Sequence, residues 1–225
     1  MAIHDEPRES MSRDELRQLQ LERLQATLNR VYRNVRFYKK AFDAIGFTPD
    51  DFDDLEMMSK LPFTSRQDLS NAYPYEMFAV PLREVVRIHS SSGTSETPSI
   101  VGYTANDLKH WTELVARLLV STGVTHEDVI QIAFNYGLFT GAFGLHYGAE
   151  RLGASVVPAS VGNTRRQVTI LRDYKPTTLV CTPGYALRIA RVIEELEIDP
   201  KTLTLKRGLF GGEPWRETTR RAIEE

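Results

Sequence analysis

Apolar and polar positions alternate in a regular rhythm over the second half of the chain. Four short apolar runs predict strands over residues 129–133, 154–157, 177–181 and 208–210. Helical periodicity predicts a helix from Thr104, before the first of these strands. Between and after the strands it predicts helices over 141–152, from Thr164, over 183–196 and from Pro214 onward. Asp107 completes a cap with Thr104, and Gln167 stands at the same capping position after Thr164. Strands that recur with intervening helices imply right-handed βαβ units, so the fold class is α/β, with mainly parallel sheets flanked by helices.

The first part of the chain has a different pattern, typical of a helical N-terminal segment. Ser12 and Glu15 make a capping box, and an apolar stripe follows at Leu16, Leu19, Leu24, Leu28 and Val31. The stripe could face a second subunit, which would give a homodimer, but a helix packed on its own domain is the commoner case. We therefore expect a helical and irregular segment over 1–80, packed on an α/β domain over 81–225.

Composition narrows the class of protein. The chain has 225 residues, 41% of them hydrophobic and 26% charged, which is typical of a soluble globular protein. The net charge of −2 offers no basic field for nucleic acid, and no apolar segment approaches the roughly 20 residues of a membrane span. Cys181 is the single cysteine, which excludes an intrachain disulfide and a cysteine-based zinc site. With no targeting signal at the N-terminus, a cytoplasmic location is expected.

A loop rich in hydroxyl side chains lies between two strand-like runs, 85–88 and 99–103, which predict a hairpin. The loop contains Ser91, Ser92, Gly93, Thr94 and Ser95. Backbone amides at a glycine turn, together with hydroxyl groups, form a concave donor surface that can accept phosphate oxygens. A plain solvated loop has the same composition. The loop lacks the Gly-Lys of a Walker-type nucleotide site.

The five histidines and the cysteine give weaker signals. His4, His110 and His126 are expected to be inert. His89 and His146 either hydrogen-bond a ligand or pack as neutral imidazoles, and no pair of histidines has the spacing of metal ligands. Cys181 ends an apolar run without a flanking cation, so we expect a small buried residue rather than a nucleophile.

Several blocks of sequence, in order, resemble the phenylacetate-coenzyme A ligase family of adenylate-forming enzymes. They are Leu61-Pro62-Phe63-Thr64 with Asp68-Leu69, Ser91 to Ser95 with Pro98, Val101 to Thr104, Tyr136 to Gly141, His146 to Ala154, and Phe210 to Trp215. The serine-rich loop alone would be weak, but the ordered set over roughly residues 20 to 220 is strong.

The resemblance implies a reaction and a set of site residues. An aryl acid, phenylacetate above all, would attack ATP to form an acyl-adenylate and would then be transferred to coenzyme A, with Mg2+ as a further cofactor. Residues 91–95 would hold the ATP phosphates. Tyr136, Phe139 and Gly141 would line the aryl-acid pocket, although aromatic residues at a strand end are also ordinary core. Gly211, Gly212, Glu213 and Pro214 would border the adenine, since glycines permit close approach of the backbone to a flat ring.

The chain departs from the family at two places. Glu96 and Thr97 stand where the family has glycine and lysine, which removes a cation from the phosphate loop. The family's magnesium glutamate, ribose aspartate and mobile-domain lysine have no counterpart before Glu225. The resemblance thus implies an incomplete N-terminal domain that is inactive alone. Two alternatives are adenylation of a deazaflavin coenzyme and a non-catalytic nucleotide-binding or interaction protein.

Overall fold

The computed structural model describes residues 3–91 and 97–225. The chain divides into two compact units. One contains residues 5–108, and the other contains residues 109–225 together with the stretch that ends at His4. Helix α5 (Ala105–Ser121) begins in the first unit and ends in the second. The sequence suggests a domain boundary after residue 80, and this boundary stays a prediction.

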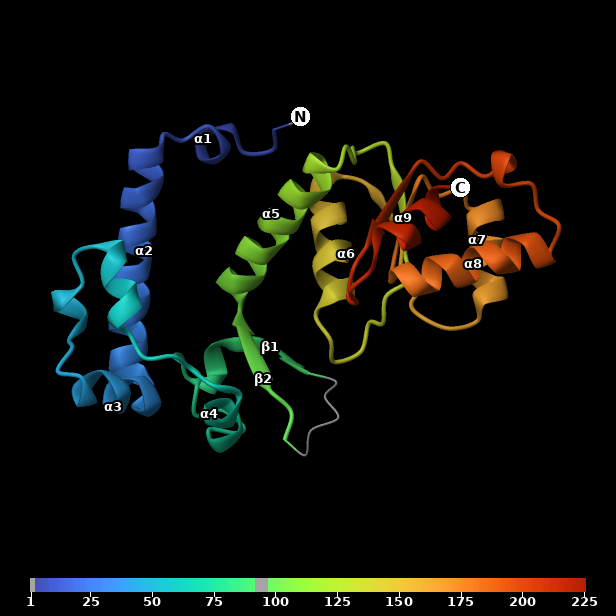
Figure 1. Cartoon of the computed structure of the whole chain (residues 1–225). Helices are drawn as coiled ribbons and strands as arrows, with labels where there is room; N and C mark the ends of the chain where they lie inside the picture. Colours follow the sequence, from blue (N-terminus) through green and yellow to red (C-terminus); the bar gives the residue numbers. More distant parts are fainter. Residues whose placement is uncertain (1–2, 92–96) are drawn as a thin grey trace. The chain divides into compact units, whose positions relative to one another are not determined.

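The unit of residues 5–108 is largely helical. It contains α1 (Glu6–Glu9), α2 (Arg13–Asn34), α3 (Arg36–Ala44) and α4 (Arg66–Asn71), with short 3₁₀ turns at Pro49–Asp51, Leu55–Lys60 and Leu82–Glu84 (Figure 1). The predicted capping box is confirmed, because Ser12 Oγ accepts from the Glu15 amide and the Glu15 carboxylate accepts from the Ser12 amide. Leu24, Leu28 and Val31 of the α2 stripe pack within this unit, in a cluster with Phe42, Phe47 and Phe52 to which Leu16 and Leu19 do not belong.

The predicted hairpin is also confirmed. Strands β1 (Val85–Ser90) and β2 (Ile100–Thr104) pair antiparallel, with a register shift between Val85 and Arg87. The imidazole of His89, 3% exposed, packs edge-on against the Tyr103 ring at 5.6 Å between centroids. His89 is therefore a buried core histidine of the hairpin.

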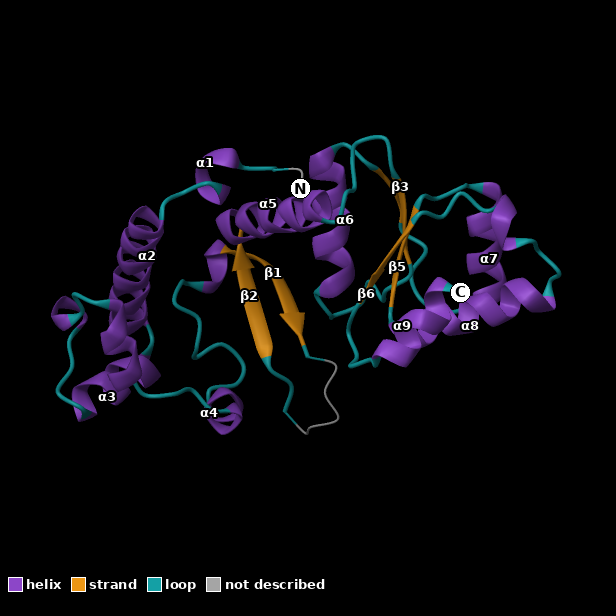
Figure 2. Ribbon diagram, turned by 45° about the horizontal axis from the view of Figure 1, so that its top comes forward, coloured by secondary structure: helices purple, strands orange, loops and turns teal. Residues whose placement is uncertain are grey.

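The second unit is built on a parallel four-stranded sheet, which confirms the α/β class. The strands are β3 (Val129–Ile132), β4 (Ser155–Val157), β5 (Thr178–Cys181) and β6 (Arg207–Phe210), in the order β4-β3-β5-β6. The connecting helices are α6 (Gly141–Leu152), α7 (Thr164–Asp173) and α8 (Pro183–Glu195), with a 3₁₀ turn at Pro200–Thr202 before β6 and helix α9 (Glu217–Glu224) at the end. Figure 2 shows the sheet between α6 on one face and α7 and α8 on the other.

Side chains that alternate along the strands make a separate core on each face of the sheet. Ile130, Ile132 and Val180 pack toward α5 and α6, in a cluster with Leu119 and Ala149. On the opposite face lie Ala133, Leu179 and Cys181, clustered with the apolar positions of α7 and α8. Strands covered on both faces read as short continuous apolar runs, which explains why all four were visible in the sequence.

Two expected helix starts differ in the structure. The cap of α7 is Asn163, whose side chain accepts from the Arg166 amide, and not Gln167. Gln167 is fully buried, and its amide group donates to the Ser160 carbonyl while its carbonyl accepts from the Gln131 side chain at 2.6 Å. The last helix begins at Glu217 rather than at Pro214, because residues 211–216 form an irregular corner. No helix among the described residues is long and apolar enough to cross a membrane.

Candidate functional site

The carboxyl ends of the four parallel strands meet at one edge of the sheet, where ligands bind in open α/β folds. The segments that leave this edge begin at Ala133 after β3, Pro158 after β4, Thr182 after β5 and Gly211 after β6. We call this edge of the sheet the carboxyl edge. Two groups of predicted site residues lie on segments that leave it, because residues 136–141 follow β3 and the corner of residues 211–214 follows β6.

The corner of residues 211–214 folds back over the ends of β3 and β5. The Gly211 amide donates to the Cys181 carbonyl at 3.3 Å. Gly212 has a positive φ of 84°, a conformation that glycine adopts without strain. A Cβ at Gly212 would lie 3.7 Å from both Phe134 Cε1 and Thr182 Cγ2, so the corner contacts segments that follow two other strands.

Glu213 does not extend freely from the corner. Its Oε1 accepts a hydrogen bond of 2.6 Å from the Gly184 amide, in the first turn of α8. The Phe210 and Trp215 rings, which flank the corner, meet edge to face at 5.9 Å between centroids. The sequence placed residues 211–214 together at a strand-to-helix corner, but it gave no signal of this contact, which joins positions 29 residues apart.

Tyr136 is held by a hydrogen-bonded chain. Its hydroxyl lies 3.2 Å from Nδ1 of His146, whose Nε2 lies 3.0 Å from Oε1 of Glu150. Burial, reinforced by the charge of Glu150, raises the pKa of Tyr136 to about 12. The phenol is therefore neutral at physiological pH. The His146 imidazole has two polar partners, Glu150 on the same helix and Tyr136 on the segment before it.

The other two residues of the predicted aryl pocket lie beside each other. Phe139 is exposed, and its Cε1 lies 3.2 Å from the point that a Cβ on Gly141 would occupy. Tyr136 instead turns its ring edge-on to Phe143 and His146 of α6. The contacts thus place Phe139 beside Gly141, and Tyr136 against α6.

A groove of about 590 Å³ runs between α7 and α8, from Gly184 at the start of α8 to Glu195 at its end. Asn163, Thr164 and Gly184 line it together with Arg165, Arg188 and Arg191. Arg165 lies 3.9 Å from Glu195, but within the described ranges neither Arg188 nor Arg191 has an ion-pair partner. The groove is therefore electropositive, and Gly184 links it to the corner through Glu213.

Most of the predicted phosphate loop, Ser92, Gly93, Thr94, Ser95 and also Glu96, lies outside the described residues. Ser91 lies in the unit of residues 5–108. Its amide donates to the Ser99 carbonyl at 2.9 Å, and its Oγ accepts from the Ser99 amide at 3.0 Å. These bonds extend the pairing of the hairpin by one step, at the point where the loop leaves β1.

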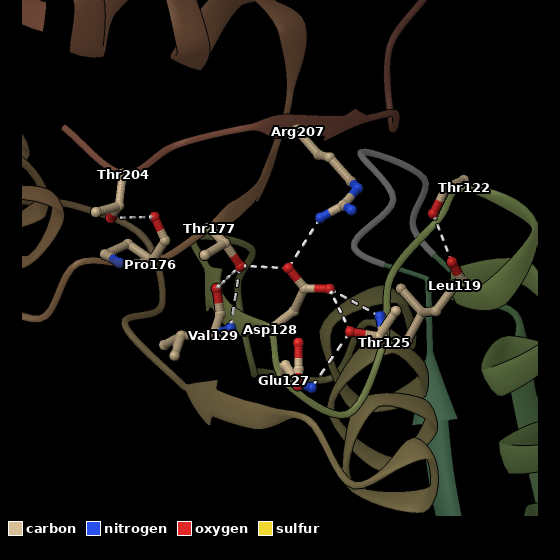
Figure 3. Close-up of polar contacts among 10 residues, drawn as sticks. All are labelled: Leu119, Thr122, Thr125, Glu127, Asp128, Val129, Pro176, Thr177, Thr204 and Arg207. Carbon is tan, nitrogen blue, oxygen red and sulfur yellow. Dashed lines mark hydrogen bonds and ion pairs between the residues drawn. The ribbon is translucent and has the colours of Figure 1, made fainter. Parts of the chain in front are cut away.

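Sequence reasoning missed a buried carboxylate at the opposite edge of the sheet (Figure 3). Asp128, 6% exposed, precedes β3. Oδ1 accepts from the Arg207 guanidinium at 2.8 Å and from the Thr177 hydroxyl at 2.6 Å, and Oδ2 accepts from the Thr125 amide at 2.7 Å. Burial alone would raise the pKa of Asp128, but the Thr177 and Thr125 hydrogen bonds and the Arg207 charge outweigh it and hold the pKa below its ordinary value. The spacing Thr125-x-x-Asp128 was the signal in the sequence that could have pointed to this carboxylate.

Cys181 is a fully buried thiol at the end of β5. Burial raises its pKa to about 12, with a smaller contribution from the negative charge of Glu213. A thiol that is neutral and inaccessible is a poor nucleophile, as the sequence suggested.

Within 3–91 and 97–225, no three His, Cys, Asp or Glu side chains are grouped so that they could hold a metal ion. No residue of this part of the chain is therefore assigned as a ligand of Mg2+.

Solved structures first identify the class. The chain superposes on a 2-hydroxyisobutyryl-CoA ligase, crystallised with 2-HIB-AMP and CoA in the thioesterification state, with a TM-score of 0.90 and 30% identity over 97% of this chain and 48% of that one. An open conformation of the same ligase gives a TM-score of 0.88 at 28% identity, over 95% of this chain and 48% of that one. The fold is that of the adenylate-forming coenzyme A ligases.

Sequence relatives then identify the family. The chain is 49% identical to the phenylacetate-coenzyme A ligase of Pseudomonas putida over 98% of its own length, and 47% identical to that of Escherichia coli (strain K12) over 97%. It spans 50% of each of these relatives. No protein-family model matches the chain. Over its own length the chain is thus similar to the phenylacetate-coenzyme A ligases, and it corresponds to about half of theirs.

Proposed function

We propose that this chain supplies part of the adenylation site of an enzyme that activates an aryl acid, phenylacetate first, with ATP and transfers it to coenzyme A. In the first step a carboxylate oxygen attacks the α-phosphorus and pyrophosphate leaves. In the second, the coenzyme A sulfur attacks the acyl carbon and AMP leaves with the carboxylate oxygen. The names of the relatives support the substrate, and the proposal depends on them for that choice.

The observation that carries the proposal is the corner of residues 211–214 at the carboxyl edge. Its backbone lies open, with nothing within 4 Å of a Cβ built on Gly211, so a flat ring can approach it. The electropositive groove beside it favours a ligand that carries phosphates. Gly211, Gly212, Glu213 and Pro214 would border the adenine in this proposal.

The segment after β3 is proposed to receive the aryl group. Phe139 and Gly141 offer an exposed ring beside a residue without a side chain. Tyr136 would contribute a neutral hydroxyl group, fixed by His146 on its far side, which can face a carboxylic acid without charge repulsion. Ser91, Ser92, Gly93, Thr94 and Ser95 would hold the β- and γ-phosphates.

Adenine binding can be tested on the chain as it is. Calorimetry with ATP and with AMP should give a measurable dissociation constant for the 225-residue chain, and Gly212→Ala should weaken it at least tenfold. The matched control is Gly46→Ala, since Gly46 has φ 66° with no atom within 4 Å of an added Cβ, and so introduces similar backbone strain away from the corner. Equal affinity in all three proteins would contradict the adenine assignment.

The chain alone is proposed to be inactive, because its relatives are about twice as long. Exchange of labelled pyrophosphate into ATP, with and without phenylacetate, should be at background level for the 225-residue chain. Acid-dependent exchange by the isolated chain would overturn this part of the proposal. In the longest polypeptide that the gene encodes, replacing Ser92 and Thr94 together with alanine should abolish exchange, whereas Thr27→Ala, a hydroxyl on the surface of α2, should not.

A further inference from the structure

The first turn of α8 has one backbone amide that its own helix and cap leave over. Pro183, the first helical residue, has no amide hydrogen. The Tyr185 amide is taken by the side chain and carbonyl of Thr182, and the Ala186 amide by the same carbonyl. The Gly184 amide is therefore left for an acceptor outside the helix, which can be a side chain or water.

Glu213 supplies that acceptor, and the fit between the two residues is close. Its Oε1 lies 2.6 Å from the Gly184 nitrogen. A Cβ on residue 184 would come within 2.9 Å of the same oxygen, so the Glu213 carboxylate would have to shift if residue 184 had a side chain. The position also favours a negative charge, because the helix dipole places partial positive charge at an N-terminus.

The corner of residues 211–214 is thus fastened at two points. At its start, the Gly211 amide is bonded to the Cys181 carbonyl of β5. Two residues later, the Glu213 side chain is bonded to α8, the helix that follows β5. Between them, a Cβ on Gly212 would lie 3.7 Å from Thr182 Cγ2, and Thr182 caps that helix.

We propose that Glu213 is a positioning residue that anchors the 211–214 corner to the N-terminus of α8. Its carboxylate faces the helix, and the corner presents its backbone to the nucleotide. The inference rests on the proposed function for the identity of the ligand, but the anchor itself can be tested without any ligand. It differs from the expectation that Glu213 forms a wall of the adenine site with its side chain.

Cys181 provides a reporter for the anchor. It is the only thiol in the chain and it is fully buried; its backbone carbonyl accepts from the Gly211 amide, and its thiol lies close enough to Glu213 for the charge of that residue to raise its pKa. Reaction with a disulfide reagent such as DTNB therefore requires that the region opens. The rate of labelling in the absence of denaturant measures how often it does so.

The variants test separately the charge of Glu213, its acceptor oxygen and the space beside residue 184. Glu213→Gln keeps an acceptor oxygen and loses the charge, Glu213→Ala loses both, and Gly184→Ala pushes the carboxylate away from the other side. The matched control is Glu194→Gln, which removes an exposed carboxylate from the last turn of the same helix. We expect Glu213→Ala to label on the order of fivefold faster than wild type, in line with the loss of a helix cap, Glu213→Gln to fall between them, and Glu194→Gln to match wild type.

Two comparisons keep the interpretation specific. Urea unfolding of each variant gives the labelling rate that global unfolding alone would allow, and the observed rate should exceed it. Glu213→Gln and Glu213→Ala both remove the negative charge that raises the pKa of the Cys181 thiol, so faster labelling of Glu213→Ala than of Glu213→Gln reports the lost acceptor and not a direct effect on the thiol. Labelling of Glu213→Ala at the wild-type rate would overturn the anchor.

Nucleotide binding tests the positioning role separately. Calorimetry with AMP should show weaker affinity in the order in which labelling accelerates, and Glu213→Gln should retain part of the affinity that Glu213→Ala loses. Faster labelling with unchanged AMP affinity would overturn the positioning role. If the wild-type chain itself bound no adenine nucleotide, the proposed function would fail, and the labelling series would still decide the anchor.

Discussion

Replacing Asp128 with asparagine should destabilise the unit of residues 109–225 by about 2–4 kcal/mol. The two carboxylate oxygens receive hydrogen bonds from the Arg207 guanidinium, the Thr177 hydroxyl and the Thr125 amide. An asparagine has one acceptor oxygen and one NH2 group. In either orientation, the NH2 group therefore faces a donor, and at least one buried hydrogen bond is replaced by a repulsive contact.

The size of the expected stability loss follows from how deeply Asp128 and Arg207 are buried. A hydrogen bond to a charged group contributes roughly 1.5–3 kcal/mol, and removing one partner of a buried ion pair costs about 3–5 kcal/mol. The Asp128 side chain is only 8% exposed, but that of Arg207 is 29% exposed, so water can partly solvate the guanidinium left behind. This solvation places the expected loss at the lower part of the range.

The same contacts predict a pH dependence. The pKa of Asp128 is lower in the folded chain than the ordinary value of about 3.9, so the unfolded state binds the proton more tightly. The stabilisation is fully present above about pH 5 and is lost as the pH falls through the folded pKa. The difference in unfolding free energy between wild type and Asp128→Asn should therefore be constant near neutrality and should shrink below about pH 4.

The assay can be confined to the relevant unit. Both tryptophans of the chain, Trp111 and Trp215, lie in residues 109–225. Urea unfolding followed by tryptophan fluorescence therefore reports on this unit. Glu127→Gln, at an exposed neighbouring position, is the matched control and should be neutral within about 0.5 kcal/mol. A loss below about 0.5 kcal/mol for Asp128→Asn at pH 7 would refute the reasoning.

Three further outcomes are expected. Ser12→Ala should lower the stability of α2 by about 1 kcal/mol through loss of its capping box with Glu15, measured by helix circular dichroism during urea unfolding; an unchanged midpoint would contradict this. Ultraviolet titration of wild type against Tyr136→Phe should assign the missing phenol a pKa near 12, and a difference that titrates near 10 would exclude its burial. Gln167→Leu should cost about 1–3 kcal/mol, because the buried Gln131 amide loses the closer of its two acceptors and keeps only the backbone carbonyl of residue 167 at 3.2 Å, and a neutral result in the fluorescence assay would contradict this.

Sequence reasoning predicted the elements that depend on local contacts. The hydroxyl of Thr104 accepts from the Asp107 amide, and the Asp107 carboxylate accepts from the Thr104 amide, as the capping spacing indicated. The helix over 141–152 has the expected bounds, and it ends at Gly153, which has a φ of 88°. Such caps join residues three or four positions apart, so the sequence contains all the information that they need.

Three of the misses depend on contacts between distant segments. Gln167 has the spacing of a cap residue, but its side chain serves Gln131, 36 positions away. Glu213 is bonded to Gly184 across 29 positions, and Asp128 to Arg207 across 79. A polar residue in an apolar setting predicts that a partner exists, but only the folded chain shows which residue it is.

The sheet of the second unit holds its buried carboxylate at one end and its candidate ligand segments at the other. Asp128 precedes β3 and Arg207 begins β6, whereas residues 134 and 211 follow the same two strands. A four-residue strand spans about 13 Å, beyond the separation at which substitutions usually influence each other. Stability gained at the amino end should therefore add to changes made at the carboxyl end. This makes the chain a suitable starting point for engineering, because a scaffold first reinforced around Asp128 would tolerate broader libraries at residues 134–141 and 211–214.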